Sequence, residues 1–211
     1  MKKHLFICFI GLILVACSTK DKLTPTQTNK FELLPQAIKA VVKTKNTQVM
    51  KQSYLLLNYK EQEILWNTKW DMILEKDKQT LSIEQKNIIL NIANFVNTKT
   101  IKNLFKNPQD GTNFLKDNLN YFKQHFTEEQ LYLLIECPYF ESDFSIFKSN
   151  NYINEFSNAR GPIAGVNNCS CYYSLSCGFI GLGSSCLDGK CQKVQGCGIV
   201  GTSNCTGTCS K

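Results

Sequence analysis

Cysteine is the residue type with the clearest chemistry in this chain, and eight of its eleven cysteines lie in the last 43 residues. Short, unequal spacers separate the eight, which are Cys169, Cys171, Cys177, Cys186, Cys191, Cys197, Cys205 and Cys209. Their density is about twice the level that already marks a disulfide scaffold. Because an even set can pair completely, we expect four disulfides, each stabilising the folded chain by about 2–4 kcal/mol.

Zinc binding is the alternative for a set of cysteines of this size. Structural zinc sites favour cysteines separated by two residues, often together with histidine. Residues 169–211, which we call the tail, contain neither that spacing nor a histidine. The missing histidine also argues against a Cys/His nucleophile. We therefore expect disulfides in the tail, with no metal, no cofactor and no catalytic residue.

The beginning of the chain indicates the compartment in which these disulfides form. Lys2 and Lys3 precede an apolar run, Leu5–Leu14, that is too short to span a bilayer. The run leads into Leu14-Val15-Ala16-Cys17, which resembles the lipobox of bacterial lipoprotein precursors. The resemblance implies a signal peptide over residues 1–16 and a lipid on Cys17; the alternative is an ordinary secretory signal followed by an unmodified Cys17. Both predict export, and disulfides persist outside the cytoplasm.

Residues 17–30 are expected to form the lipid anchor and a solvated tether, because they are rich in threonine and charge. Ser18–Lys22 resembles the charged sorting stretch of some Bacteroidota surface lipoproteins. The two resemblances together imply an outer-membrane lipoprotein of the cell envelope, with exposure at the cell surface. The expected partner is its own membrane through Cys17, and then membranes or surface components of neighbouring cells.

The middle of the chain, residues 31–158, has the apolar spacing of helices and is long enough for one domain with a core. We expect about five or six helices. The stripes are Trp66, Trp70, Ile73 and Leu74; Ile88, Ile92 and Phe95; and Leu115, Leu119, Phe122 and Phe126.

Local signals predict where these helices begin and end. Ser82–Gln85 and Thr127–Gln130 both fit the capping box, in which side chains satisfy otherwise unpaired amides of the first turn. Pro35 suits a first helical position. Pro108–Gly111 has the composition of a turn between two helices.

No residue of the middle region has the neighbours that catalysis needs. His125 is its only histidine, and its place in an apolar stripe indicates a structural or surface role. Trp66 and Trp70 could stack on a ligand, but their helical spacing favours core packing. Cys137 lies near an expected helix end, and we interpret it as a buried, inert thiol rather than a reactive one. We expect no enzyme activity.

Composition changes near residue 159, and residues 159–168 are expected to form a linker because they are small and lack helical spacing. Arg160, within it, is the only arginine of the chain. Chance in a lysine-rich protein explains that better than a processing point for an arginine-specific protease, which stays the alternative.

One bridge of the tail can be argued from turn chemistry. Asp188-Gly189 favours a two-residue hairpin turn, which places Cys186 opposite Cys191 at bridging distance. We therefore predict a Cys186–Cys191 disulfide. The alternative is that each of these cysteines bonds a distant strand and closes a longer loop.

The tail also offers features for a membrane partner. Its three lysines outnumber its one aspartate, which predicts mild attraction to anionic lipids and no nucleic-acid binding. An apolar stretch between glycines either contacts a membrane or forms the tail's own small core, which we favour; it contains Phe179, Ile180 and Leu182.

The cysteine order of the tail, with Asn168-Cys169-Ser170-Cys171 and Gly196-Cys197-Gly198, resembles the fulvocin C-related bacteriocin family of Bacteroidota lipoproteins. Tyr59–Lys69 is similar to a recurrent helix of those proteins. The resemblance implies an antimicrobial tail, with the helical region as its leader or presenting scaffold. The alternative is a non-toxic surface interaction or adhesion lipoprotein with a disulfide knot. The expected fold is mainly α: a helical domain, then a small disulfide-rich module with irregular structure and a β-hairpin.

Overall fold

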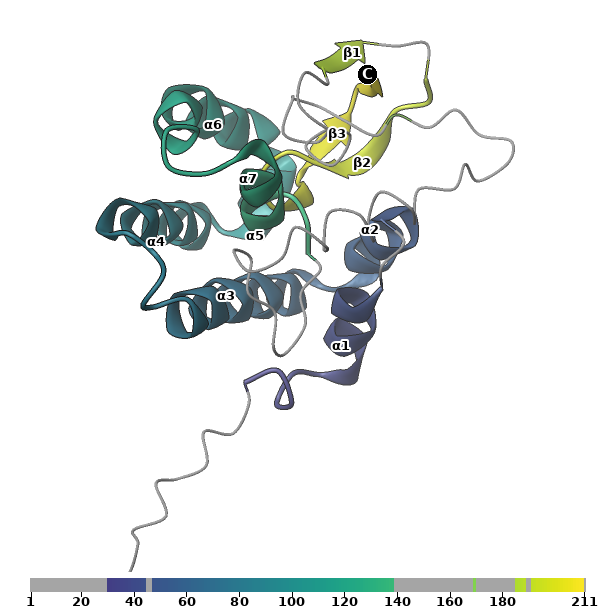
Figure 1. The fold of residues 1–211 in the computed structure, drawn as a ribbon. Coiled ribbons are helices and arrows are strands. Elements are labelled where there is room, and N and C mark those ends of the chain that lie inside the picture. The colour runs from purple at the N-terminus through teal and green to yellow at the C-terminus, as the bar shows by residue number, and fades with distance from the viewer. Residues whose placement is uncertain (1–29, 45–46, 139–168, 170–184, 189–190, 211) are drawn as a thin grey trace, which may run out of the picture.

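The protein is mainly helical, with a small region of strands and disulfides at its C-terminal end (Figure 1). This arrangement confirms the fold class expected from the sequence. The structure is a computed structural model, and it describes residues 30–44, 47–138, 169, 185–188 and 191–210.

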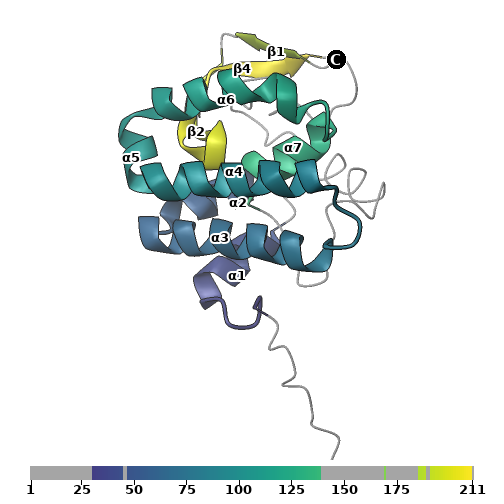
Figure 2. The same cartoon turned by 90° about the vertical axis from the view of Figure 1, so that its left-hand side faces the viewer.

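Seven α-helices lie within the described residues, slightly more than the sequence predicted. Their bounds are α1 (Gln36–Lys43), α2 (Thr47–Leu56), α3 (Tyr59–Lys76), α4 (Ile83–Lys99), α5 (Ile101–Lys106), α6 (Pro108–Phe122) and α7 (Glu128–Ile135). Figure 2 shows α1, α3, α4 and α6 stacked one above another. None of the described helices is long and apolar enough to cross a bilayer.

The predicted capping boxes mark the starts of two helices. Ser82 caps α4 with Gln85, and Thr127 caps α7 with Gln130. Pro35 occupies the N-cap of α1, one residue before the position expected for it. The turn predicted at Pro108–Gly111 is wrong, since these four residues form the first turn of α6. Proline at the first helical position lacks only an N–H that the helix would leave unpaired, so it starts a helix as readily as a turn.

The core lies between the helices and contains both tryptophans. Trp66 and Trp70 are almost fully buried, which confirms core packing as their role. Their rings lie with centroids 5.5 Å apart, and the indole N–H of Trp70 donates to the carbonyl of Leu134 at 3.0 Å. Burying a tryptophan needs such a partner for its N–H. The hydrogen bond from Trp70 joins α3 to α7.

The strands form two small antiparallel pairs. Strand β1 (Ser185–Asp188) pairs with β4 (Gly207–Ser210), and β2 (Val194–Cys197) pairs with β3 (Ser203–Cys205). A short 3₁₀ helix, η2 (Ile199–Gly201), connects β2 to β3. Figure 2 shows β1 and β4 beyond α6, and β2 between α6 and α4. Among the described residues of the tail, the hairpin of neighbouring strands is β2–β3.

Candidate functional site at the junction of helices and tail

Two disulfides join described cysteines of the tail. Cys169 bonds Cys191 and Cys197 bonds Cys205, each with Cα atoms 5.1 Å apart. Cys186 is also disulfide-bonded. The side chains of Cys171, Cys177 and Cys209 lie outside the described residues, so a total of four bridges remains a prediction.

The predicted Cys186–Cys191 bridge is wrong, because Cys191 bonds Cys169. The reason is strand pairing. Strand β1 pairs with β4, which places Cys186 opposite Cys209 and Leu187 opposite Thr208. The Asp188-Gly189 turn signal suggested a local partner for β1, whereas its actual partner is about twenty residues away along the chain. The alternative weighed from the sequence, bonding to a distant segment, is the one found for Cys191.

The loop between β2 and β3, residues 198–202, is inserted into the helical core. We call it the docking loop. The side chains of Ile199 and Val200 are fully buried, and they belong to the same apolar cluster as Trp66 and Tyr54. Cys169, Cys197 and Cys205 form a second, smaller cluster, against which Cys191 and Val194 pack. The described part of the tail therefore has only this small cluster of its own, and it places Ile199 and Val200 in the core of the helical domain.

A chain of hydrogen bonds holds the docking loop against the tryptophans. The hydroxyl of Tyr54, on α2, donates to the carbonyl of Val200 at 2.8 Å. The indole N–H of Trp66 donates to the same hydroxyl oxygen at 3.1 Å. All three groups are buried, where such bonds are strong and their loss leaves polar atoms unpaired.

The backbone of the docking loop is strained and closely packed. Val200 has φ 47° and ψ 29°, the left-handed region that β-branched residues avoid. Strain of this kind costs about 1–3 kcal/mol and persists only where the surroundings enforce it. Gly201 also has positive φ, and a Cβ there would lie 3.2 Å from the ring of Tyr54. The loop thus keeps its shape because it is clamped by its bridge and by α2.

The Cys197–Cys205 bridge closes this loop, so removing it should weaken docking. We expect Cys197→Ser with Cys205→Ser to lower the free energy of unfolding by about 2–3 kcal/mol, the entropy of closing a loop of this length. Urea unfolding followed by tryptophan fluorescence measures it, because both tryptophans report on the helical core. Asn204→Ala, an exposed change in β3, is the control and should leave the midpoint in place. An unchanged midpoint in the double serine variant would show that the bridge does not support the helical core.

Lys69 is the one described lysine whose side chain is fully buried. Its ammonium donates to the carbonyls of Leu133 and Cys137 and lies 5.1 Å from the ring centre of Trp66. Burial lowers the pKa of Lys69 to about 8, partly offset by the Cys137 thiol. Such a pKa suits a nucleophile, but a side chain with no exposed surface cannot reach a substrate. Lys69 instead satisfies the carbonyls at the end of α7.

The remaining residues singled out in the sequence fall into two groups. Cys137 is buried and forms no disulfide, which confirms its reading as a buried thiol. His125 follows α6 and contacts the ring of Tyr121 edge-on. Outside the described residues lie Cys17, Arg160, the predicted linker, and the apolar residues Phe179, Ile180 and Leu182. Within the described part of the chain, no group of three metal-ligating side chains comes together.

The docking loop is the structural feature that sequence reasoning missed. The pattern that could have indicated it is Gly198-Ile199-Val200-Gly201, in which two aliphatic residues lie between glycines in a segment closed by a disulfide. A loop of this kind has no room to bury aliphatic side chains within itself, so they must pack against something else. Tyr54 gave no signal, because its partner is 146 residues away.

Comparison of the chain with family models, curated proteins and solved structures found no match to any of them.

Proposed function

We propose that the protein is a cell-envelope lipoprotein, anchored through Cys17, that carries a disulfide-stabilised antimicrobial tail similar to fulvocin C. In this proposal the helical domain is a scaffold that holds the tail. The observation that supports this role best is the burial of Ile199 and Val200 in the helical core. Held there, the two most apolar residues of the docking loop are kept away from the producer's own membrane.

Release of the docking loop is the step that would activate the tail. Once withdrawn from α2 and α6, Ile199 and Val200 stand on a loop whose ends a disulfide joins. Exposed aliphatic side chains on a preorganised loop favour insertion into a lipid surface, and the excess of lysine in the tail favours anionic lipids. The docked form is then the stored form, and the undocked form is the one that contacts a target membrane.

The test compares two oxidised chains that lack the signal peptide: the wild type and Gly111→Leu, which blocks the seat of Ile199. We expect Gly111→Leu to inhibit growth of bacteria related to the producer, and to release dye from anionic vesicles, more strongly than the wild type. The same chains after reduction and alkylation are the control, and they should be inactive. No inhibition by either oxidised chain would contradict an antimicrobial function.

A non-toxic interaction protein is the second candidate, and one observation favours it. The tail contributes two fully buried residues to the main core, so it is an integral part of the fold rather than an appended peptide. In that case the oxidised chains would bind to cells saturably and leave their growth unchanged. The growth assay and a binding assay on the same cells therefore separate the two functions.

A further inference from the structure

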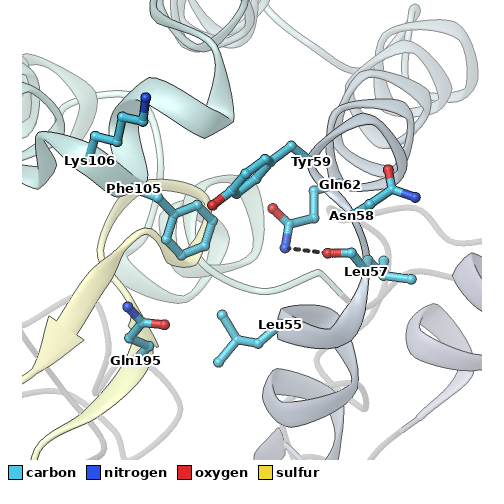
Figure 3. A pocket seen from close by; sticks show the side chains of 8 residues that line it. All are labelled: Leu55, Leu57, Asn58, Tyr59, Gln62, Phe105, Lys106 and Gln195. Atoms are coloured by element: carbon cyan, nitrogen blue, oxygen red, sulfur yellow. Dashed lines mark hydrogen bonds between the residues drawn. The ribbon is translucent and has the colours of Figure 1, made fainter.

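A hollow of about 410 Å³ lies where the end of α2, the start of α3, α5 and strand β2 meet (Figure 3). Leu55, Leu57 and Phe105 line it with apolar surface, and Tyr59 adds an aromatic ring. The volume falls within the range of small-molecule sites in proteins. Because β2 belongs to the tail, both parts of the protein contribute to this hollow.

Gln62 supplies the polar feature that points to a ligand. Its side chain is 2% exposed, and its amide nitrogen donates to the carbonyls of Tyr54 at 3.1 Å and Leu57 at 3.2 Å. These two acceptors fix which end is nitrogen. The amide oxygen has no hydrogen-bond partner among the described residues, and Figure 3 shows it directed away from Leu57, toward Tyr59 and Phe105. A buried acceptor of this kind calls for a donor.

The rest of the lining limits the chemistry of that donor. The rings of Tyr59 and Phe105 lie with centroids 5.7 Å apart and planes tilted by 44°, so they offer aromatic surface in two directions. Lys106 and Gln195 are exposed at the rim and can donate to a ligand's oxygens. None of the described residues that line the hollow is a carboxylate.

We propose that this hollow binds a small neutral sugar of one or two rings. A sugar hydroxyl or acetamido N–H supplies the donor that Gln62 needs, and the weakly positive C–H face of a sugar ring packs on the negative faces of Tyr59 and Phe105. A purely apolar ligand would leave the Gln62 oxygen unpaired. An anion would be repelled by the partial negative charge of the Gln62 oxygen. A cation would have no carboxylate to bind among the described lining residues. The proposal does not depend on antimicrobial activity.

Ligand-observed NMR and calorimetry on the oxidised chain without its signal peptide test the proposal, with N,N′-diacetylchitobiose and maltose as probes. We expect saturable binding of at least one sugar below about 10 mM. Gln62→Met and Phe105→Leu should each weaken it by about tenfold, the size expected for one lost hydrogen bond or one lost ring contact. Gln195→Ala should weaken it less. Gln192→Ala, an exposed glutamine of the same segment outside the hollow, should leave it unchanged.

Two results would overturn the proposal. One is the absence of saturable binding by either sugar. The other is equal binding by wild type, Phe105→Leu and Gln195→Ala, which would place any sugar elsewhere on the protein. Gln62→Met removes donors from two backbone carbonyls and can fail to fold, so circular dichroism accompanies it. If it does not fold, the outcome rests on Phe105→Leu and Gln195→Ala, whose side chains donate no hydrogen bonds that the structure describes.

Discussion

Replacing Gly111 with alanine is expected to lower the free energy of unfolding by about 1–3 kcal/mol, the usual cost of overfilling a packed core. This change in stability has the opposite sign to that usually seen in a helix, where replacing glycine with alanine stabilises the protein by about 1 kcal/mol. Gly111 lies in α6 against the docking loop, and a Cβ there would overlap Cγ2 of Ile199. Either α6 or Ile199 must shift to relieve this overlap, and Ile199 is fully buried, so its branched side chain cannot turn out into solvent. Urea unfolding followed by tryptophan fluorescence measures the change.

The same substitution in an Ile199→Ala background separates a docking effect from a helix effect. Ile199→Ala alone should cost about 2–5 kcal/mol, because it leaves a cavity between α6 and the tail. In that background Gly111→Ala should be neutral or stabilising, so the two changes should show a coupling energy of opposite sign to their single costs. Lys116→Ala, an exposed change in α6, is the control and should alter stability by less than about 0.5 kcal/mol. Equal destabilisation by Gly111→Ala in both backgrounds would show that Ile199 is not seated there.

The helical part of the fold could be predicted because its signals are local. A capping box is complete within four residues, and Ser82 and Thr127 each begin a helix as expected. The stripe containing Trp66 and Trp70 also needs only its own helix to be recognised. Pro108 is ambiguous, because a proline with polar neighbours and a glycine fits a turn and a helix start equally well.

The tail could not be predicted in the same way, because distant segments determine it. Strand β1 pairs with β4 rather than with its neighbour along the chain, so the turn signal at Asp188 indicated the wrong partner for Cys186. Ile199 and Val200 are buried by residues that precede them by about 90 to 150 positions. No sequence pattern indicates the proposed role of Gln62 either, because that role depends on where α5 and β2 lie. Contacts of this range come from tertiary packing, which residue spacing does not encode.

The pH dependence of stability should reveal the buried lysine. We expect the free energy of unfolding to rise between about pH 8 and pH 10, the window set by the lowered pKa of Lys69 and the ordinary value of 10.5. Below pH 8 Lys69 is protonated in both the folded and the unfolded state, and burial of its charge destabilises the folded state. Within the window the folded state has released the proton while the unfolded state still binds it. Stability rises with pH wherever the unfolded state binds more protons.

The expected gain is about 3 kcal/mol if the whole window is crossed, at about 1.4 kcal/mol for each unit between the two pKa values. Tyr54 sets the upper pH limit of this rise in the free energy of unfolding. Burial raises the pKa of the Tyr54 hydroxyl well above its ordinary value of 10, so above pH 10 the folded state keeps a proton that the unfolded state loses. That difference lowers stability, and the profile should therefore pass through a maximum near pH 10.

Lys69→Met tests the assignment, because methionine keeps an unbranched stem in the same space and removes the charge. Its absolute stability should change, since two carbonyls lose their donor; the diagnostic result is that its stability no longer rises from pH 8 to pH 9.5. Lys102→Met, on an exposed lysine of α5, should keep the rise. All chains should carry Cys17→Ser and Cys137→Ala, so that no free thiolate attacks the disulfides at alkaline pH. Because Cys137 raises the pKa of Lys69, its removal extends the rise in stability to lower pH and keeps its sign. Parallel profiles for Lys69→Met and its parent would mean that Lys69 keeps its ordinary pKa in the folded protein.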